Sequence, residues 1–304
     1  MPPAEYLTVF SLGVNCFLLP PELYNSRSRV VLSLADTFPK KETSGMYESI
    51  LNSMNQAARA GGALILAAHD HSAHWKEGHF NFATDTDLKV QQNIQEMLAS
   101  DFPNVQFFAE EQENRPLSDV AAFVVDPIDG TINFARGRRA SVVSIAYLEK
   151  QQPVCAVVYQ PYSDECFTAI AGRGAFLNGS PIHTADTPLS RAVVAFGTSP
   201  YDPELCRDSM QIAADFMKEC GDLRRVGAAA LDLCDVACGR SDVFFELRLR
   251  PWDVAAGALI VKEAGGIYAS IGLDAPVFSR SAGAFACCPS CSGAMAVIRK
   301  TLDR

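Results

Sequence analysis

The chain carries the sequence AAFVVDPIDGT at residues 121–131. Its first five residues are apolar and predict a short buried strand. Two carboxylates, Asp126 and Asp129, follow this strand, and Gly130 and Thr131 then offer backbone N–H groups and a hydroxyl. Carboxylate oxygens bind hard divalent cations, and glycine N–H groups beside a hydroxyl suit a phosphate. The turn is therefore predicted to bring metal ions and a phosphate ester together.

The composition is that of an acidic globular protein, with 48% hydrophobic residues, 20% charged residues and a net charge of -9. This charge argues against nucleic acid or an anionic membrane as the main partner. No apolar run approaches the ~20 residues that a membrane-spanning helix needs. An acidic protein that handles phosphate needs cations at its site, and the turn described above favours metal ions over an arginine cluster.

The ten cysteines are scattered through apolar segments, which is typical of buried free thiols in a reducing cytoplasm. Three of them are clustered, namely Cys287, Cys288 and Cys291, and the last two have C-x-x-C spacing. No second pair of ligands follows in the sequence, so we interpret the three as core and helix-start residues. A zinc-binding or redox role is the alternative.

Residues 1–45 differ from the rest, because they contain five prolines and no sustained hydrophobic period. The apolar stretch from Val9 to Leu19 has no basic residue before it and no small-residue cleavage pattern, which argues against a signal peptide. An amphipathic helical pattern begins at Met46. We therefore predict a poorly ordered extension over residues 1–45 and a folded unit over residues 46–304.

The folded unit has two halves with different patterns. Residues 46–185 read as two helices followed by a series of strands, which predicts a largely antiparallel sheet with helices on it. Residues 186–304 alternate strands and helices, which favours an α/β layer with mostly parallel strands. We expect the first half to carry the metal and phosphate groups and the second half to bind the rest of the substrate.

Acidic residues recur at the ends of predicted strands. Glu110 and Glu111 end one strand, Asp126 and Asp129 end the next, and Asp253 follows a tryptophan near the start of a helix. Four carboxylates in one pocket repel each other, at a cost of about 4 kcal/mol per pair at 4 Å and an effective dielectric near 20. Such a cluster must bind protons or metal ions. Any one of these acids alone is more simply a surface turn residue or a helix cap.

Two further signals are weaker. Asp87 lies near a helix start, where it could cap the helix or accept a proton from a threonine hydroxyl. Small residues at two possible helix starts, Gly130-Thr131 and Gly227-Ala228-Ala229, would let a phosphate approach backbone N–H groups.

These motifs together resemble those of the inositol monophosphatases. The sequence DPIDGTINF at residues 126–134 resembles the first signature of that family, and WDVAAGALIVKEAGG at residues 252–266 resembles the second. Residues 109–111 resemble its Gly-Glu-Glu element, and residues 81–87 resemble its Asp-x-Val-Thr-x-x-Asp element. The resemblance extends from about Met46 to the C-terminus.

The resemblance implies a five-layer α/β/α/β/α fold and a Mg²⁺-dependent phosphomonoesterase, commonly homodimeric and often inhibited by lithium. It also implies roles for individual residues. Thr131, polarised by Asp87, would act with Glu110 to activate the attacking water, and a second metal would stabilise the leaving alkoxide. Ala229 and Glu246 would contact hydroxyls of the sugar or inositol, and Gly130 and Thr131 would hold phosphate oxygens. Two or three Mg²⁺ ions would be bound by Glu110, Asp126, the carbonyl of Ile128, Asp129 and Asp253.

The chain departs from the family pattern at several positions. Asn81, Ala83 and Ala109 replace an expected aspartate, valine and glycine, and arginines stand at positions 136 and 139. The approach to Trp252 is unusually basic. Arg248 or Arg250 could recognise a second anionic group on the substrate, or both could be solvent-exposed loop arginines.

The leading hypothesis is hydrolysis of inositol-1-phosphate by metal-activated water. Within the same family, the alternatives are fructose-1,6-bisphosphate, NADP and histidinol phosphate as substrates, with a 3′-phosphonucleotide ranked lower. A non-catalytic regulatory binding protein is the alternative from another class. Loss of a metal-binding carboxylate would favour that alternative, and the sequence retains all four.

Overall fold

The computed structural model describes residues 44–68, 73–75 and 82–303. The predicted extension over residues 1–45 therefore lies outside the described residues, apart from its last two positions, which belong to the first helix. Asn81, one of the departures from the family pattern, also lies outside them.

The first sheet has seven strands in the order β3-β4-β5-β6-β7-β8-β9. Only the β3–β4 pair is parallel, and each of the other neighbouring pairs is antiparallel. This confirms the antiparallel sheet predicted for the first half. The strands are β3 (Gln106–Ala109), β4 (Ala121–Asp129), β5 (Val142–Glu149), β6 (Gln152–Gln160), β7 (Glu165–Ile170), β8 (Ala175–Leu177) and β9 (Ser180–Ile182).

The second sheet has five strands in the order β11-β10-β12-β14-β13. Its pairs β10–β11 and β10–β12 are parallel, whereas β14 runs antiparallel to both of its neighbours. Four strands thus share one direction, as expected for this half, and β14 is the reversed one. The strands are β10 (Val193–Phe196), β11 (Asp222–Arg224), β12 (Val243–Leu249), β13 (Ile267–Ile271) and β14 (Ala282–Cys287).

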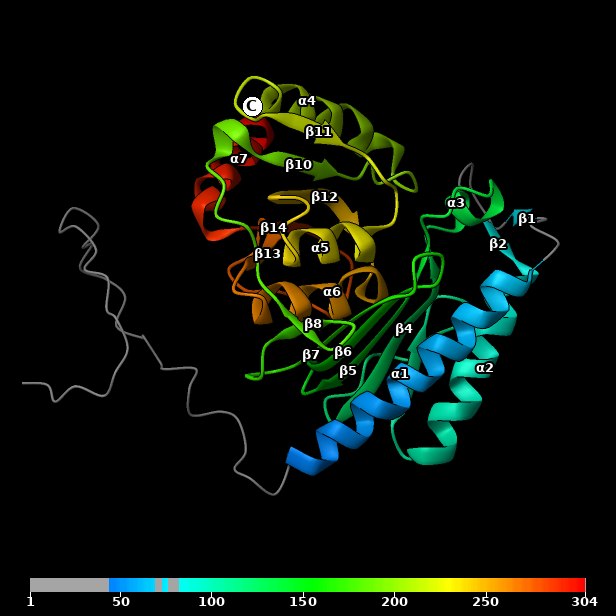
Figure 1. Ribbon diagram of the computed structural model, residues 1–304. Helices are drawn as coiled ribbons and strands as arrows, with labels where there is room; N and C mark the ends of the chain where they lie inside the picture. The colour runs from blue at the N-terminus through cyan, green and yellow to red at the C-terminus, as the bar shows by residue number, and fades with distance from the viewer. Residues whose placement is uncertain (1–43, 69–72, 76–81, 304) are drawn as a thin grey trace, which may run out of the picture. The chain divides into compact units, whose positions relative to one another are not determined.

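Helices form three layers around these sheets, as Figure 1 shows. The helices α1 (Ser44–Ala67) and α2 (Asp85–Asp101) cover one face of the seven-stranded sheet. The helices α5 (Ala229–Ala237) and α6 (Pro251–Glu263) lie between the two sheets. The helices α4 (Cys206–Phe216) and α7 (Met295–Leu302) pack on the far side of the five-stranded sheet. The predicted α/β/α/β/α sandwich is confirmed.

The middle helix α6 is buried almost all round, with every residue from Val254 to Val261 inside the protein. A helix on a protein surface shows one apolar stripe, whereas a helix between two sheets must be apolar on both sides. The small residues of α6 also permit close packing. A Cβ added at Gly257 would lie 2.7 Å from side-chain atoms of Leu233 on α5, so only glycine fits at this crossing.

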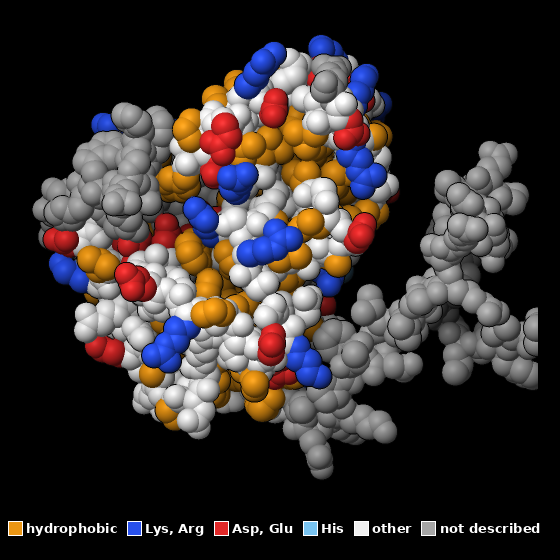
Figure 2. Space-filling view, turned by 180° about the vertical axis from the view of Figure 1, so that it is seen from behind, with side chains coloured by type: hydrophobic (Ala, Val, Ile, Leu, Met, Phe, Trp, Pro, Cys, Tyr) orange, Lys and Arg blue, Asp and Glu red, His pale blue; other side chains and the backbone are white. Residues whose placement is uncertain are grey.

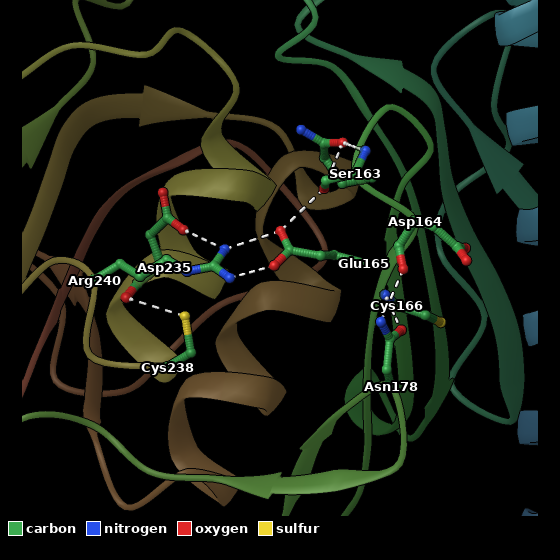
Figure 3. Close-up of polar contacts among 9 residues, drawn as sticks. Ser163, Asp164, Glu165, Cys166, Asn178, Asp235, Cys238 and Arg240 are labelled. Carbon is green, nitrogen blue, oxygen red and sulfur yellow. Dashed lines mark hydrogen bonds and ion pairs between the residues drawn. The ribbon is translucent and has the colours of Figure 1, made fainter.

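Polar contacts join the middle layer to the seven-stranded sheet. Arg240, just after α5, forms ion pairs with Glu165 on β7 and with Asp235 of its own helix (Figure 3). Glu263, at the end of α6, accepts hydrogen bonds from the N–H groups of Gly172 and Gly174, each at 2.8 Å. These contacts fix the helices α5 and α6 relative to the hairpins that lie under them.

Several helices have starts that local sequence determines, and some short elements complete the fold. α2 begins at Asp85, because Thr84 and Asp87 form a capping box at its start. Between β10 and β11, the chain forms a 3-10 turn, η4 (Pro203–Leu205), before the helix α4 begins at Cys206. The last helix likewise follows a 3-10 segment, η5 (Pro289–Ala294). Two short strands, β1 (Ala73–Trp75) and β2 (Phe82–Thr84), form an antiparallel pair, and η3 (Leu189–Arg191) precedes β10.

Among the described residues, no helix is both long and apolar enough to cross a membrane. On the described part of the face drawn in Figure 2, Lys and Arg side chains are spread singly among acidic and polar ones and form no continuous basic surface.

Candidate active site

The two aspartates of the first motif reach one pocket because β4 is irregular at its end. This strand continues four residues further than the apolar run predicted, to Asp129. Asp126 pairs with Ser144 and Asp129 with Val142, so three steps along β4 match two steps along β5. Such a bulge rotates the strand, and residues that would face opposite sides of a regular strand can then face the same side.

The pocket at this point gathers nine of the ten predicted site residues. Asp126 and Asp129 meet Glu110, which follows β3, and Asp253, which lies in the first turn of α6. The second sheet closes the opposite side through Glu246 on β12. The remaining predicted residues that line the pocket are Ile128, Gly130, Thr131 and Ala229. The tenth residue, Asp87, lies behind the pocket against Thr131.

The carboxylates in this pocket lie in a largely desolvated place, with Asp126 and Asp129 buried and Glu110 and Asp253 half-buried. Burial raises the pKa of Asp126 and of Asp253 well above the usual range, and repulsion from Glu110 and Asp129 raises both further. Burial also raises the pKa of Asp129 to about 6, although backbone N–H groups partly compensate its charge. The set consists of oxygen donors only, which is the chemistry that Mg²⁺ prefers over softer metals. Among the described residues, no three acidic, His or Cys side chains already converge on one point as metal ligands.

Asp129 also makes a contact that the sequence did not reveal. Its two oxygens accept hydrogen bonds from the N–H groups of Ala229 and Ala230, at 3.2 and 2.7 Å. These N–H groups open α5, where unpaired donors and the helix dipole favour a negative charge. Ala229 therefore lies in the pocket as predicted, and its N–H group is bound to Asp129.

Thr131 and Asp87 are in contact, as the sequence predicted. The Thr131 hydroxyl oxygen lies 3.4 Å from Oδ1 of Asp87 and 3.1 Å from the carbonyl oxygen of Ile128, so two acceptors compete for its single proton. Asp87 also accepts hydrogen bonds from the backbone N–H and the hydroxyl of Thr84. Burial raises the pKa of Asp87 to about 6. The capping and proton-accepting interpretations of Asp87 therefore hold together.

Gly130 is required by the turn between β4 and the short helix α3 (Thr131–Ala135). Its φ of +86° lies in the left-handed region that favours glycine. A Cβ at this position would also approach the carbonyl oxygen of Ala140 and the Cβ of Ala228 to 3.0 Å. The glycine thus lets the chain turn sharply while the start of α3 stays at the pocket.

Glu246 is a buried acid on the opposite side. Burial raises its pKa to about 7, and its Oε1 accepts a hydrogen bond from the N–H of Ser199 at 2.7 Å. Its carboxylate occupies the space beside Gly197, where an added Cβ would lie 1.8 Å from Oε2. Only glycine at position 197 leaves room for this acid.

The two arginines singled out in the sequence, Arg248 and Arg250, have different surroundings. Arg250 lines the pocket and donates to the Ser281 hydroxyl at 2.8 Å. Arg248 instead forms an ion pair with Asp202 at 2.6 Å and a longer one with Glu204 at 3.4 Å. The sequence analysis missed Arg225, which lines the pocket and donates to the Thr198 hydroxyl at 3.2 Å. A single arginine after a strand carries no pattern that would have marked it.

The cysteine cluster lies away from this pocket. Cys287, Cys288 and Cys291 are buried in the core beneath α7, and the last two direct their thiols toward the carbonyl of Thr187. All three are free thiols. This supports their interpretation as core residues.

A family model, the inositol monophosphatase family, matches residues 46–290. The chain belongs to this family. The matched range contains every predicted site residue and both signatures.

Several proteins are similar to this chain over most of their own length. Inositol monophosphatase 3 of Solanum lycopersicum is 38% identical over 230 residues, which cover 73% of this chain and 86% of the relative. Nus factor SuhB of Escherichia coli strain K12 is 38% identical over 223 residues, which cover 72% and 84%. Among solved structures, the Thermotoga maritima IMPase superposes with a TM-score of 0.77 at 27% identity, over 84% of this chain and 98% of that one. Family members thus carry the names of both a phosphatase and a Nus factor.

Proposed function

We propose that this protein is a Mg²⁺-dependent phosphomonoesterase that hydrolyses a polyol phosphate, with inositol-1-phosphate as the preferred substrate. The observation that carries the proposal is the pocket, where buried Asp126 and Asp129 and half-buried Glu110 and Asp253 stand beside Gly130 and Thr131 and face Glu246. The substrate would lie across the pocket, with its phosphate toward the first sheet and its polyol toward the second.

Glu110, Asp126, Asp129, Asp253 and the Ile128 carbonyl would hold the metal ions. When bound, Mg²⁺ would neutralise these carboxylates, lower the pKa of a bound water and stabilise the alkoxide that leaves. The buried oxygens fit this use, because an oxygen-only set with raised pKa values is the environment that a hard cation relieves.

The chain's own residues would orient the water and take its proton. Thr131 donates its proton to Asp87 or to the Ile128 carbonyl, so a lone pair of its hydroxyl oxygen is left to accept from the attacking water. Glu110 lines the same pocket and would take the proton as a general base. The N–H groups at Gly130 and Thr131 would stabilise the charge on the phosphate oxygens.

The polyol side of the pocket supports a hydroxyl-rich substrate. Glu246 keeps one carboxylate oxygen beyond the one that accepts from Ser199, and a carboxylate suits a polyol hydroxyl. Arg225 and Arg250 line the same side and could donate to further hydroxyls. Homodimer formation and inhibition by lithium depend on the family resemblance alone and stay predictions.

The test is phosphate release from a panel of phosphomonoesters, with Mg²⁺ and with EDTA. We expect Mg²⁺-dependent release, highest with inositol-1-phosphate. Release mainly from fructose-1,6-bisphosphate, NADP or histidinol phosphate would retain the mechanism and replace the substrate.

A regulatory role is the second candidate, because several relatives are named Nus factor SuhB. No phosphate release from any ester, in a protein that still binds Mg²⁺, would favour this role. The complete carboxylate set favours the phosphatase.

A further inference from the structure

A short loop after β10 of the five-stranded sheet borders the pocket and has no role in the proposed chemistry. We call residues 197–202 the mouth loop; it joins β10 to η4. Gly197, Pro200 and Tyr201 of this loop line the pocket, on the side that would receive the polyol.

The mouth loop is held in a strained conformation. Ser199 is buried and has a φ of +44°, in the left-handed region that non-glycine residues rarely adopt. Its N–H donates to Glu246, and its hydroxyl oxygen accepts from the N–H of Arg248 at 2.9 Å. Such a conformation persists only where the surroundings fix it, and it tends to occur at functional sites.

Both ends of the mouth loop are tied by arginines. Arg225 donates to the hydroxyl of Thr198, and Arg248 forms an ion pair with Asp202 at 2.6 Å. Arg248 thus contacts the loop twice, through its backbone at Ser199 and through its side chain at Asp202. The loop is therefore preformed against β12.

This arrangement places Tyr201 at the opening of the pocket. Tyr201 is 47% exposed, although it lines a pocket whose floor includes the buried Asp126 and Asp129. Burial of its phenol raises the pKa of Tyr201, and the charges of Glu110 and Asp253 raise it further. Tyr201 thus borders the pocket while about half of its surface faces solvent. A large, half-exposed aromatic ring at a site entrance is free to pack against a ligand.

We propose that Tyr201 is a specificity-determining residue that contacts the alcohol part of the substrate, and that Arg248 is the positioning residue that holds it there. The ring would pack on the C–H face of a cyclic polyol, and the phenol would donate a hydrogen bond to the ester or to a neighbouring hydroxyl. The pocket would then prefer cyclic polyol phosphates over acyclic ones. This inference rests on the proposed function.

The test compares two esters with similar alkoxide leaving groups, inositol-1-phosphate and β-glycerophosphate, of which only the first has a ring. In Tyr201→Ala we expect kcat/KM for inositol-1-phosphate to fall roughly tenfold and that for β-glycerophosphate to stay within about twofold. In Tyr201→Phe the ring remains, so the fall for inositol-1-phosphate should be smaller.

The role of Arg248 is tested by the ratio of kcat/KM for inositol-1-phosphate to kcat/KM for β-glycerophosphate. In Arg248→Gln the loop loses its ion pair, and we expect the preference for inositol-1-phosphate to fall by roughly three- to fivefold, mainly through KM. Arg248→Lys should restore part of the preference, because a lysine can still pair with Asp202. The matched control is Arg173→Gln, which removes another exposed arginine–carboxylate pair, with Glu48 at 2.9 Å, and should leave the ratio unchanged.

The possible outcomes separate the two proposals. Equal losses for both esters in Tyr201→Ala, or no loss for either, would overturn the role of Tyr201 and leave the phosphatase assignment intact. An unchanged ratio in Arg248→Gln would overturn the positioning role. No phosphate release from either ester by the wild-type protein would overturn the proposed function and this inference with it.

Discussion

Two sets of carboxylates in this protein have opposite environments. On the outside, Asp164, Glu165, Asp215 and Asp222 are bound by arginine or lysine side chains, and these hydrogen bonds lower the pKa of each carboxyl. In the pocket, burial dominates and raises the pKa values, most strongly for Asp126 and Asp253. The chain has arginines near the pocket, but they are bonded to hydroxyls and to the mouth loop.

The difference shows where the chain gives up stability. Burying a charge opposes folding, and hydrogen bonds offset only part of that cost, whereas a paired surface charge is nearly neutral. The pocket carboxylates thus lower the stability of the fold, and a cation that binds them would recover part of that free energy. The predictions below test this contrast.

The largest effect is expected for Asp126→Asn. The amide oxygen can still accept the N–H of Ile128, as Asp126 does at 3.0 Å, so the turn should persist. Loss of one metal-binding charge should lower Mg²⁺-dependent phosphate release by at least about 10³-fold, a loss of about 4 kcal/mol in transition-state stabilisation. Unfolding by urea in EDTA should show equal or greater stability.

The matched control is Asp222→Asn, which removes an exposed carboxylate paired with Arg224. Its activity should equal that of the wild type. Near-normal activity in Asp126→Asn would refute the assignment of the pocket as the catalytic site.

The second effect concerns pH and Asp87. The pKa of Asp87 is about 6 in the folded protein and 3.8 for an aspartate in an unfolded chain, so the folded state binds more protons between these pH values. Stability therefore falls as pH rises through this window, by about 3 kcal/mol for this group. The free energy of unfolding in EDTA, measured from pH 4 to pH 7, should decline less steeply in Asp87→Asn. Parallel pH profiles for the two proteins would contradict the raised pKa.

The third effect is stabilisation by metal. Mg²⁺ at 100 times its dissociation constant should add about 2.7 kcal/mol to the free energy of unfolding, because only the folded pocket binds it. The shift in thermal midpoint should be lost or greatly reduced in Asp126→Asn. An equal shift in both proteins would place the bound metal outside the pocket.

The smallest effect is expected at the surface. Arg240→Gln removes the ion pairs with Glu165 and Asp235 and should lower the free energy of unfolding by about 1 kcal/mol at low salt. Because these pairs lie away from the pocket, phosphate release should not change. A loss above about 3 kcal/mol would show that this contact is as important to the fold as a buried group.

The sequence predicted the pocket better than its surroundings. The sequence alone shows that some acids follow apolar runs or open a helix, as Asp126, Asp129 and Asp253 do. The bulge in β4 was missed, because a proline between two aspartates reads as a turn. The reversal of β14 was also missed, since alternation of strands and helices does not encode strand direction.

Side chains that reach the pocket from irregular segments were not predictable. Arg225 and Tyr201 belong to no motif, and only the fold brings them to the carboxylates. Arg248 was noted for its charge, but its partner Asp202 is 46 residues away in the chain. Pairings of this kind depend on tertiary structure and leave no local signal.

The helix α6 has a consequence for how this protein folds. The residues of α6 from Val254 to Val261 are buried against a sheet on either side. The helix therefore cannot bury its whole apolar surface until both sheets have formed. The seven-stranded sheet alone would expose one apolar face to water, and so would the five-stranded sheet. We therefore expect one cooperative unfolding transition for the two halves, with no stable product from a chain cut near residue 186. The proposed catalytic pocket includes Asp253 in the first turn of that shared helix, so it would appear only in the last step of assembly.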